Sequence, residues 1–218
     1  YWDKSEAWAH ASSTDMSTRT ESLTLAMRHQ PTVLTRAREL LGCHLVGHGA
    51  TVMITEVEAY DGVNDPASHA FTRTPRSEIM YGPPMRLYVY RLHGHHCANV
   101  VTGPTESASA VLIRAGRIVD GVDTARERRL SARDDDALAR GPGNLTQALG
   151  ITIEDLGTDL RDPSPVTLRP AGAAIDAARI LSGPRVGVRR AAEQPAARLE
   201  VGLQRAEDRG EDPGRSVG

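Results

Sequence analysis

The stretch LYVYRLHGHHCANVV, residues 87–101, decides the fold because it contains two strands and the bend that joins them. Tyr88 and Tyr90 alternate with aliphatic residues, which is the two-residue period of a β-strand, so both rings lie on one face. Gly94 supplies the backbone freedom that a tight bend requires, and an apolar run follows it. The segment therefore predicts an antiparallel hairpin.

The bend also carries four potential metal ligands, namely His93, His95, His96 and Cys97. Three interpretations are open: a zinc site, a buried hairpin with incidental histidines, or a wedge that enters another molecule. Zinc sites usually take spaced pairs of ligands from separate elements, so neighbours at one bend converge poorly on an ion. A flat ring at a hairpin tip suits a side chain that unstacks nucleic-acid bases.

The rest of the chain places strands in the middle, with helices before, between and after them. This order lacks the regular alternation of a doubly wound fold and favours an α+β domain around an antiparallel sheet. Helices are expected over residues 31–42, from 123 and over 144–150, and further strands over 43–47, 51–60, 109–119 and 165–170.

Composition narrows the class of protein. The 218 residues suffice for one domain with a real core. The formal net charge of −2 gives no global sign of nucleic-acid binding, so any such surface has to be local. Two cysteines make no disulfide framework, and neither a membrane-spanning apolar run nor a signal peptide is present. We therefore expect a cytoplasmic protein without membrane contact.

Both ends of the chain differ from its middle. Residues 1–30 are rich in Ser and Thr and lack aliphatic periodicity, so they predict a disordered leader. Residues 196–218 contain no aromatic residue and end in a charged, glycine-rich run, which buries too little apolar surface to stay ordered. The sequence therefore predicts a folded domain over 31–195 and a divergent, poorly ordered tail over 196–218.

Glu56, Glu58 and Tyr60 point the same way, because residues two apart in a strand share a face. One interpretation is an edge strand with a solvated face. The other is a general base beside an aromatic platform.

Four more polar residues have both a structural and a functional interpretation. His69 lies in a loop rich in turn residues and, taken alone, is more often structural than catalytic. Arg73 and Arg76 in the same loop either grip phosphates or are solvated. Arg114 lies in the apolar run VLIRAG, where a buried arginine needs a partner such as the Glu58 carboxylate or a phosphate.

Several motifs, taken in chain order, resemble one family. They are LLGCHLVG, ITEVEAYDGVNDPASHA, TPRSEIMYGPP, LYVYRLHGHHCANVV, AVLIRAG, LARGPGNLTQALGI and PRVGVRR, between about Leu34 and Pro195. Together they resemble the alkyladenine (3-methyladenine) DNA glycosylases of the human-enzyme type. The resemblance implies a single compact α+β domain with a curved, mainly antiparallel sheet, flanking helices and a protruding hairpin.

The resemblance also implies an activity. It indicates a monofunctional DNA glycosylase that flips alkylated or deaminated purines out of duplex DNA and hydrolyses their N-glycosidic bond, which starts base excision repair. The enzyme is expected to act as a monomer without metal or other cofactor. In this family pattern Glu58 matches the base that activates the attacking water, and Arg114 matches the arginine that helps to hold that water.

Five further residues match the family's binding residues. Tyr60, His69 and Tyr90 match the aromatic walls that hold the flipped base. Asn99 matches the asparagine that excludes the 2-amino group of normal guanine. His93 matches the residue at the hairpin tip that fills the gap left by the flipped base.

The chain departs from the family pattern at two places. A tyrosine is commonest at the tip, and the smaller imidazole of His93 is expected to wedge less well but to attract phosphates. After PRVGV the family has a Trp/Phe-rich strand that this tail lacks. A second hypothesis is therefore a degenerate homologue that binds damaged DNA with little or no excision. A third is an unrelated zinc protein that uses the hairpin histidines.

Overall fold

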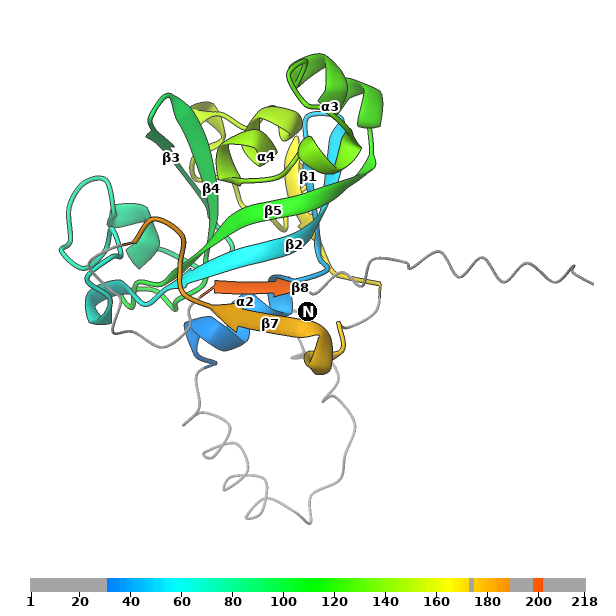
Figure 1. The fold of residues 1–218 in the computed structure, drawn as a ribbon. Helices are drawn as coiled ribbons and strands as arrows, with labels where there is room; N and C mark the ends of the chain where they lie inside the picture. The colour runs from blue at the N-terminus through cyan, green and yellow to red at the C-terminus, as the bar shows by residue number, and fades with distance from the viewer. Residues whose placement is uncertain (1–30, 173–174, 189–197, 202–218) are drawn as a thin grey trace, which may run out of the picture.

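Strand β2, Ala50–Tyr60, is the central strand of the fold (Figure 1). The computed structural model describes residues 31–172, 175–188 and 198–201. One edge of β2 pairs with β5, Ala110–Asp120, over most of its length. The other edge pairs first with β1, His44–Gly47, and then with β8, Arg198–Val201. An interior strand thus carries the two candidate carboxylates.

The described strands form one curled sheet in which every pairing is antiparallel (Figure 1). The order is β3, β4, β5, β2, β1 and β6, with β8 beside β2 and β7 beside β8. The remaining strands are β3 Leu87–Leu92, β4 His95–Val101, β6 Val166–Arg169 and β7 Ile180–Gly183. This arrangement confirms the expected α+β domain around a curved antiparallel sheet.

Three α-helices occur in the described residues: α2 Val33–Leu40, α3 Val122–Arg128 and α4 Pro142–Leu149. Helix α2 begins as expected, because the Thr32 side chain accepts a hydrogen bond from the Thr35 N–H. The other two begin one and two residues earlier than predicted. Proline suits the first turn of α4, where its missing N–H would have no helical partner.

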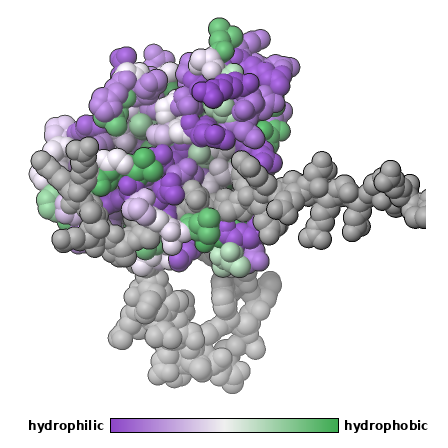
Figure 2. Space-filling model, in the orientation of Figure 1, coloured by the Kyte–Doolittle hydropathy of each residue, from purple (hydrophilic) through white to green (hydrophobic). Residues whose placement is uncertain are grey.

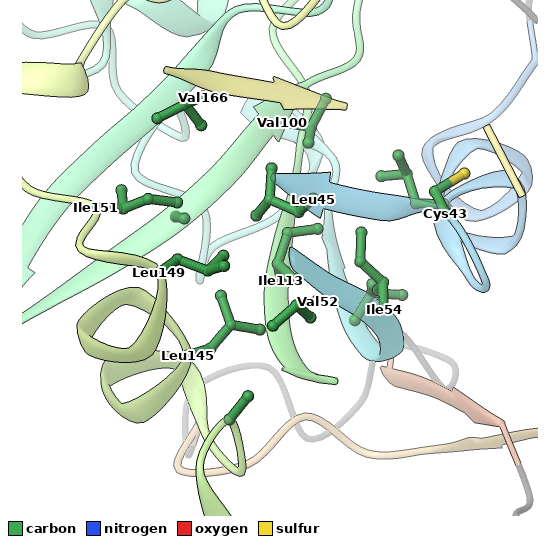
Figure 3. Close-up of a cluster of buried hydrophobic side chains, with 14 of the residues drawn as sticks. Cys43, Leu45, Val52, Ile54, Val100, Ile113, Leu145, Leu149, Ile151 and Val166 are labelled. Atoms are coloured by element: carbon green, nitrogen blue, oxygen red, sulfur yellow. The ribbon is translucent and has the colours of Figure 1, made fainter. Parts of the chain in front are cut away.

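The main core lies between the sheet and α4. Leu145 and Leu149 point from the helix towards Leu45, Val52 and Ile113, and all five side chains are fully buried (Figure 3). A β-sheet with this much apolar contact on one face is rigid there, so residues on its other face are held at fixed positions.

A smaller apolar cluster lies on the opposite face of the sheet. In β3, Leu87 and Val89 belong to the main core, whereas Tyr88 between them belongs to the second cluster. Because successive residues of a strand point to opposite faces, Tyr88 faces away from α4. The loop between β2 and β3 covers this second face with Ala70, Met80 and Tyr81.

The C-terminal region differs from the expectation for it. Residues 196–218 were predicted to be a poorly ordered tail, but Arg198–Val201 form β8, which pairs with residues 56–58 of β2. A strand is held by main-chain hydrogen bonds, which need no aromatic side chains, so composition alone did not indicate it. The predicted leader, residues 1–30, and the rest of the tail lie outside the described residues.

The face shown in Figure 2 is mainly hydrophilic, with apolar residues in small, separate spots. Large apolar side chains that are exposed include Phe71, Leu92 and Leu130. Such scattered residues are normal on a protein surface. No helix in the described part of the chain is long and apolar enough to cross a membrane.

The contact between β5 and β2 leaves no room for a side chain at Gly116. A Cβ atom there would lie 2.2 Å from Val52 Cγ1 and 2.4 Å from the Met53 carbonyl oxygen. We predict that Gly116→Ala lowers the free energy of unfolding by about 2 kcal/mol, measured by urea denaturation. Gly172→Ala is the control, since its Cβ would meet nothing within 4 Å. Equal effects of the two changes would contradict this account of the sheet.

Candidate active site

A row of side chains crosses four strands on the face opposite the main core. Glu58 of β2 pairs with Leu112 of β5, Leu112 pairs with Asn99 of β4, and Asn99 pairs with Tyr88 of β3. Directly opposed residues of antiparallel strands share a face. Residues from four separate stretches of sequence are therefore brought together by strand register.

A pocket opens on this face. It encloses about 330 Å³ of open space, counting its mouth. The residues that line it come from the sheet and from the loop after β2; they are Tyr60, Ala67, His69, Met80, Tyr88, Tyr90, Asn99 and Ala110. Four of the predicted binding residues, Tyr60, His69, Tyr90 and Asn99, thus meet in one place.

Three of the aromatic rings form a contiguous group. The His69 ring meets the Tyr90 ring edge-on, with centroids 4.6 Å apart and planes at 75°. Tyr88 and Tyr90 lie 5.5 Å apart, and His69 Nδ1 is 2.8 Å from the Tyr88 hydroxyl. The role of Tyr88 was missed by sequence analysis, although its position on the same strand face as Tyr90 was the available signal.

His69 is held as a neutral imidazole. Burial of the ring and, secondarily, the positive charge of Arg76 lower the pKa of His69 from 6.5 to about 4. A neutral ring donates from one nitrogen and accepts at the other, so it can share a hydrogen bond with the Tyr88 hydroxyl. The pocket therefore presents uncharged aromatic surfaces near pH 7.

Glu58 is a buried carboxylate with three partners. Only 1% of the residue is exposed. Its Oε2 accepts a hydrogen bond from the Tyr60 hydroxyl at 2.9 Å, and its Oε1 accepts one from the Val186 N–H at 2.8 Å. Arg114 Nη1 lies 3.4 Å from the same Oε1. Glu58 is joined to the pocket through the Tyr60 hydroxyl, because Tyr60 also lines the pocket.

Arg114 bridges the two carboxylates of β2. Its Nε donates to Glu56 Oε1 at 2.9 Å, in addition to the ion pair with Glu58. The pairing of β2 with β5 shifts register around Glu56, and such a bulge re-aims side chains. Arg114 thus has the carboxylate partner that its place in an apolar run requires, and β2 is not the solvated edge strand of the simpler interpretation.

A second buried ion pair supports Tyr60 from behind. Arg185 pairs with Asp65 through both of its terminal nitrogens, and it donates to the Ala59 carbonyl oxygen at 3.0 Å. The guanidinium carbon lies 4.6 Å from the centre of the Tyr60 ring. Sequence analysis missed this pair, although Arg185 belongs to the motif PRVGVRR. Tyr60 is thus held in two ways: its hydroxyl is hydrogen-bonded to Glu58, and its ring is stacked against Arg185.

Asn99 is anchored at the pocket by its own strand pair. It is 3% exposed, and its Nδ2 donates to the Tyr88 carbonyl oxygen at 3.0 Å. That contact uses the amide nitrogen as donor and fixes the orientation of the side chain.

His93 lies outside the pocket, at the exposed tip of the β3–β4 hairpin. His93 and Gly94 are the two residues between the strands, and both have positive φ, 48° and 84°. A left-handed backbone is unusual for histidine and matches the tight two-residue turns of hairpins. Among the described residues, no three His, Cys, Asp or Glu side chains are grouped so that they could hold a metal ion.

The arrangement defines a chemical class. Aromatic rings line the pocket, and a buried carboxylate is hydrogen-bonded to the hydroxyl of one of them. A group of this kind takes or gives protons and stabilises positive charge that develops beside the pocket. Such a site is suited to acid–base chemistry on a molecule held in the pocket.

Comparison with known proteins identifies the family. The family model of methylpurine-DNA glycosylase (MPG) matches residues 27–201. The chain is 52% identical over 167 residues to a Mycobacterium tuberculosis (strain ATCC 25618 / H37Rv) protein, covering 73% of this chain and 80% of that one. It is 48% identical over 193 residues to a Mycolicibacterium paratuberculosis (strain ATCC BAA-968 / K-10) protein, covering 83% and 92%.

Both relatives are named "Putative 3-methyladenine DNA glycosylase". This chain belongs to the methylpurine-DNA glycosylase family, as its motifs indicated. It is a DNA glycosylase, a hydrolase of DNA repair. The family match runs through β8, the strand that the composition of the tail did not predict.

The low pKa of His69 makes stability depend on pH. Between pH 6.5 and about 4 the unfolded chain takes up a proton at this position and the folded chain does not, so acid favours unfolding. We predict that wild type loses more stability than His69→Gln as the pH falls through this window. Because His69 is exposed to solvent, screening by water makes the difference smaller than the full shift would give. Urea denaturation of both proteins at several pH values measures it, and parallel curves would contradict the assignment.

Proposed function

We propose that this DNA glycosylase is monofunctional and acts on alkylated or deaminated purines in duplex DNA. In this proposal it is a cytoplasmic monomer that flips the purine into the aromatic pocket, hydrolyses the N-glycosidic bond and so starts base excision repair. The observation that carries the proposal is the hydrogen bond between the buried Glu58 carboxylate and the hydroxyl of Tyr60, which lines the pocket.

The enzyme has to flip the damaged base out of the duplex in order to reach the glycosidic bond. The glycosidic bond of a stacked purine cannot be reached inside a duplex, and extrusion costs a few kcal/mol, least at damaged or mispaired positions. Stacking on aromatic side chains returns about 1–3 kcal/mol per base. Tyr60, His69, Tyr88 and Tyr90 supply that surface here.

Hydrolysis requires charge stabilisation and a proton acceptor. When the bond to the sugar breaks, its electron pair leaves with the purine and positive charge develops on the sugar. Water then adds to the sugar carbon and transfers a proton to a base. Glu58 fits both roles, because two hydrogen bonds and an ion pair with Arg114 hold its carboxylate in place, and the carboxylate still has lone-pair sites for a water molecule. Arg114 orients Glu58 and the water.

Two features support a monofunctional reaction with selective binding. A lyase needs an amine nucleophile, and the single lysine of the sequence is Lys4, far from these motifs in the chain. Asn99 lines the pocket with a fixed amide, and we assign to it the rejection of bases with a 2-amino group, as in normal guanine.

The decisive test is single-turnover excision from a short duplex with one hypoxanthine, with alkali used to cut the abasic product. We predict that Glu58→Gln lowers the rate by at least about 10³-fold, because the proton acceptor and its charge are lost. Glu56→Gln is the matched control on the same strand. It should lose at least about tenfold less activity, since Glu56 contacts Arg114 but not Tyr60.

Other outcomes of this assay separate the hypotheses. Equal excision by wild type and Glu58→Gln would mean that another group is the base. Binding of the lesion duplex by folded wild type without excision would instead favour the degenerate homologue that binds damaged DNA.

The hairpin tip is assigned the role of a wedge that fills the gap left by the flipped base. The exposed His93 ring lies at a turn whose backbone is fixed by the pairing of Leu92 with His95. We predict that His93→Ala weakens binding to the lesion duplex by about 1–2 kcal/mol, measured by fluorescence anisotropy, because the lost ring no longer occupies the gap. His93→Tyr should bind at least as well as wild type. Full affinity of His93→Ala would remove the wedge role.

A further inference from the structure

Each of two tyrosines of the pocket is stacked against an arginine. The guanidinium carbon of Arg185 lies 4.6 Å from the centre of the Tyr60 ring, and that of Arg76 lies 5.0 Å from the centre of the Tyr90 ring. The two arginines differ in their surroundings. Arg185 is buried and its charge is balanced by Asp65. Arg76 is exposed, and no carboxylate of the described residues forms an ion pair with it.

The uncompensated charge of Arg76 reaches several residues that line the pocket. It contributes to the lowered pKa of His69, where a nearby cation disfavours a second positive charge. At Tyr88 it partly opposes the rise in pKa that burial causes. Together with the stacking on Tyr90, these effects show that its positive field extends over the Tyr88–Tyr90–His69 side of the pocket.

We propose that Arg76 sets the preference of the pocket for the charge of its substrate. Its positive charge lowers the affinity for cationic alkylated purines relative to neutral modified purines. This inference rests on the proposed function. A purine alkylated at N7 of the ring carries a formal positive charge in DNA, whereas hypoxanthine is neutral. Tyrosine faces alone attract a cation. Here the Tyr90 ring already interacts with one cation, and a second cation in the pocket is repelled more strongly once water is excluded.

The test compares binding of two lesions that differ in charge. Duplexes of one sequence carry 7-methyladenine or hypoxanthine, neither of which has a 2-amino group, on a 2′-fluoro sugar, which disfavours the oxocarbenium-like transition state, so the lesion binds without being excised. The ratio of the two Kd values cancels every contact that is common to both duplexes. We expect Arg76→Gln to shift this ratio about 3-fold towards the cationic lesion. Arg76→Lys, which keeps the charge, should leave the ratio near the wild-type value.

Arg133→Gln is the control for the loss of one exposed arginine elsewhere on the surface, and it should not change the ratio. Three results would overturn the inference. An unchanged ratio with both affinities reduced would make Arg76 a contact to DNA phosphate. An unchanged ratio with unchanged affinities would make it a solvated residue. Equal shifts in Arg76→Gln and Arg76→Lys would trace the effect to shape instead of charge.

Failure of the proposed function would look different. In that case wild type would not excise ordinary hypoxanthine, whether or not it binds the 2′-fluoro duplexes more tightly than undamaged DNA. A wild type that excises hypoxanthine, combined with a ratio that does not respond to Arg76, would overturn only the role of Arg76.

Discussion

The fold depends on compensating the buried negative charge of one carboxylate, that of Glu58. Moving the charge of Glu58 out of water costs several kcal/mol unless partners compensate it. Those partners are the Tyr60 hydroxyl of the same strand, Arg114 of β5 and the N–H of Val186 after β7. They lie up to 128 positions away in the chain. The curled sheet places these partners next to one another around Glu58. The pocket lies on the same face of the sheet.

The C-terminal part of the described chain encloses this carboxylate. Arg185 stacks behind Tyr60, Val186 donates to Glu58, and β8 pairs with β2 so that Arg198 lies opposite Glu58. Because β8 lies there, the main chain of β2 is paired with a neighbouring strand from Glu56 to Glu58. The tail thus supports the site through main-chain contacts, even though it lacks the aromatic residues that the family pattern led us to expect.

Periodicity allowed much of the site to be predicted. The two-residue repeat placed Glu58 and Tyr60 on one face, the hairpin followed from LYVYRLHGHHCANVV, and a buried arginine in VLIRAG required a partner, either a carboxylate such as that of Glu58 or a phosphate. Contacts set by strand register and loop path could not be read in the same way. The pairing of Asp65 with Arg185 joins segments 120 positions apart, and the stacking of Arg76 on Tyr90 depends on how one loop folds over the sheet.

In the proposed mechanism the Glu58 carboxylate stabilises positive charge at the sugar beside the pocket. The most direct measurement is the affinity for two duplexes with stable sugar analogues at the lesion position, a cationic pyrrolidine and a neutral tetrahydrofuran. We predict that wild type binds the pyrrolidine duplex at least about 100-fold more tightly, as for a transition-state mimic, and that Glu58→Gln loses most of this preference. Equal affinity of wild type for both duplexes would contradict it.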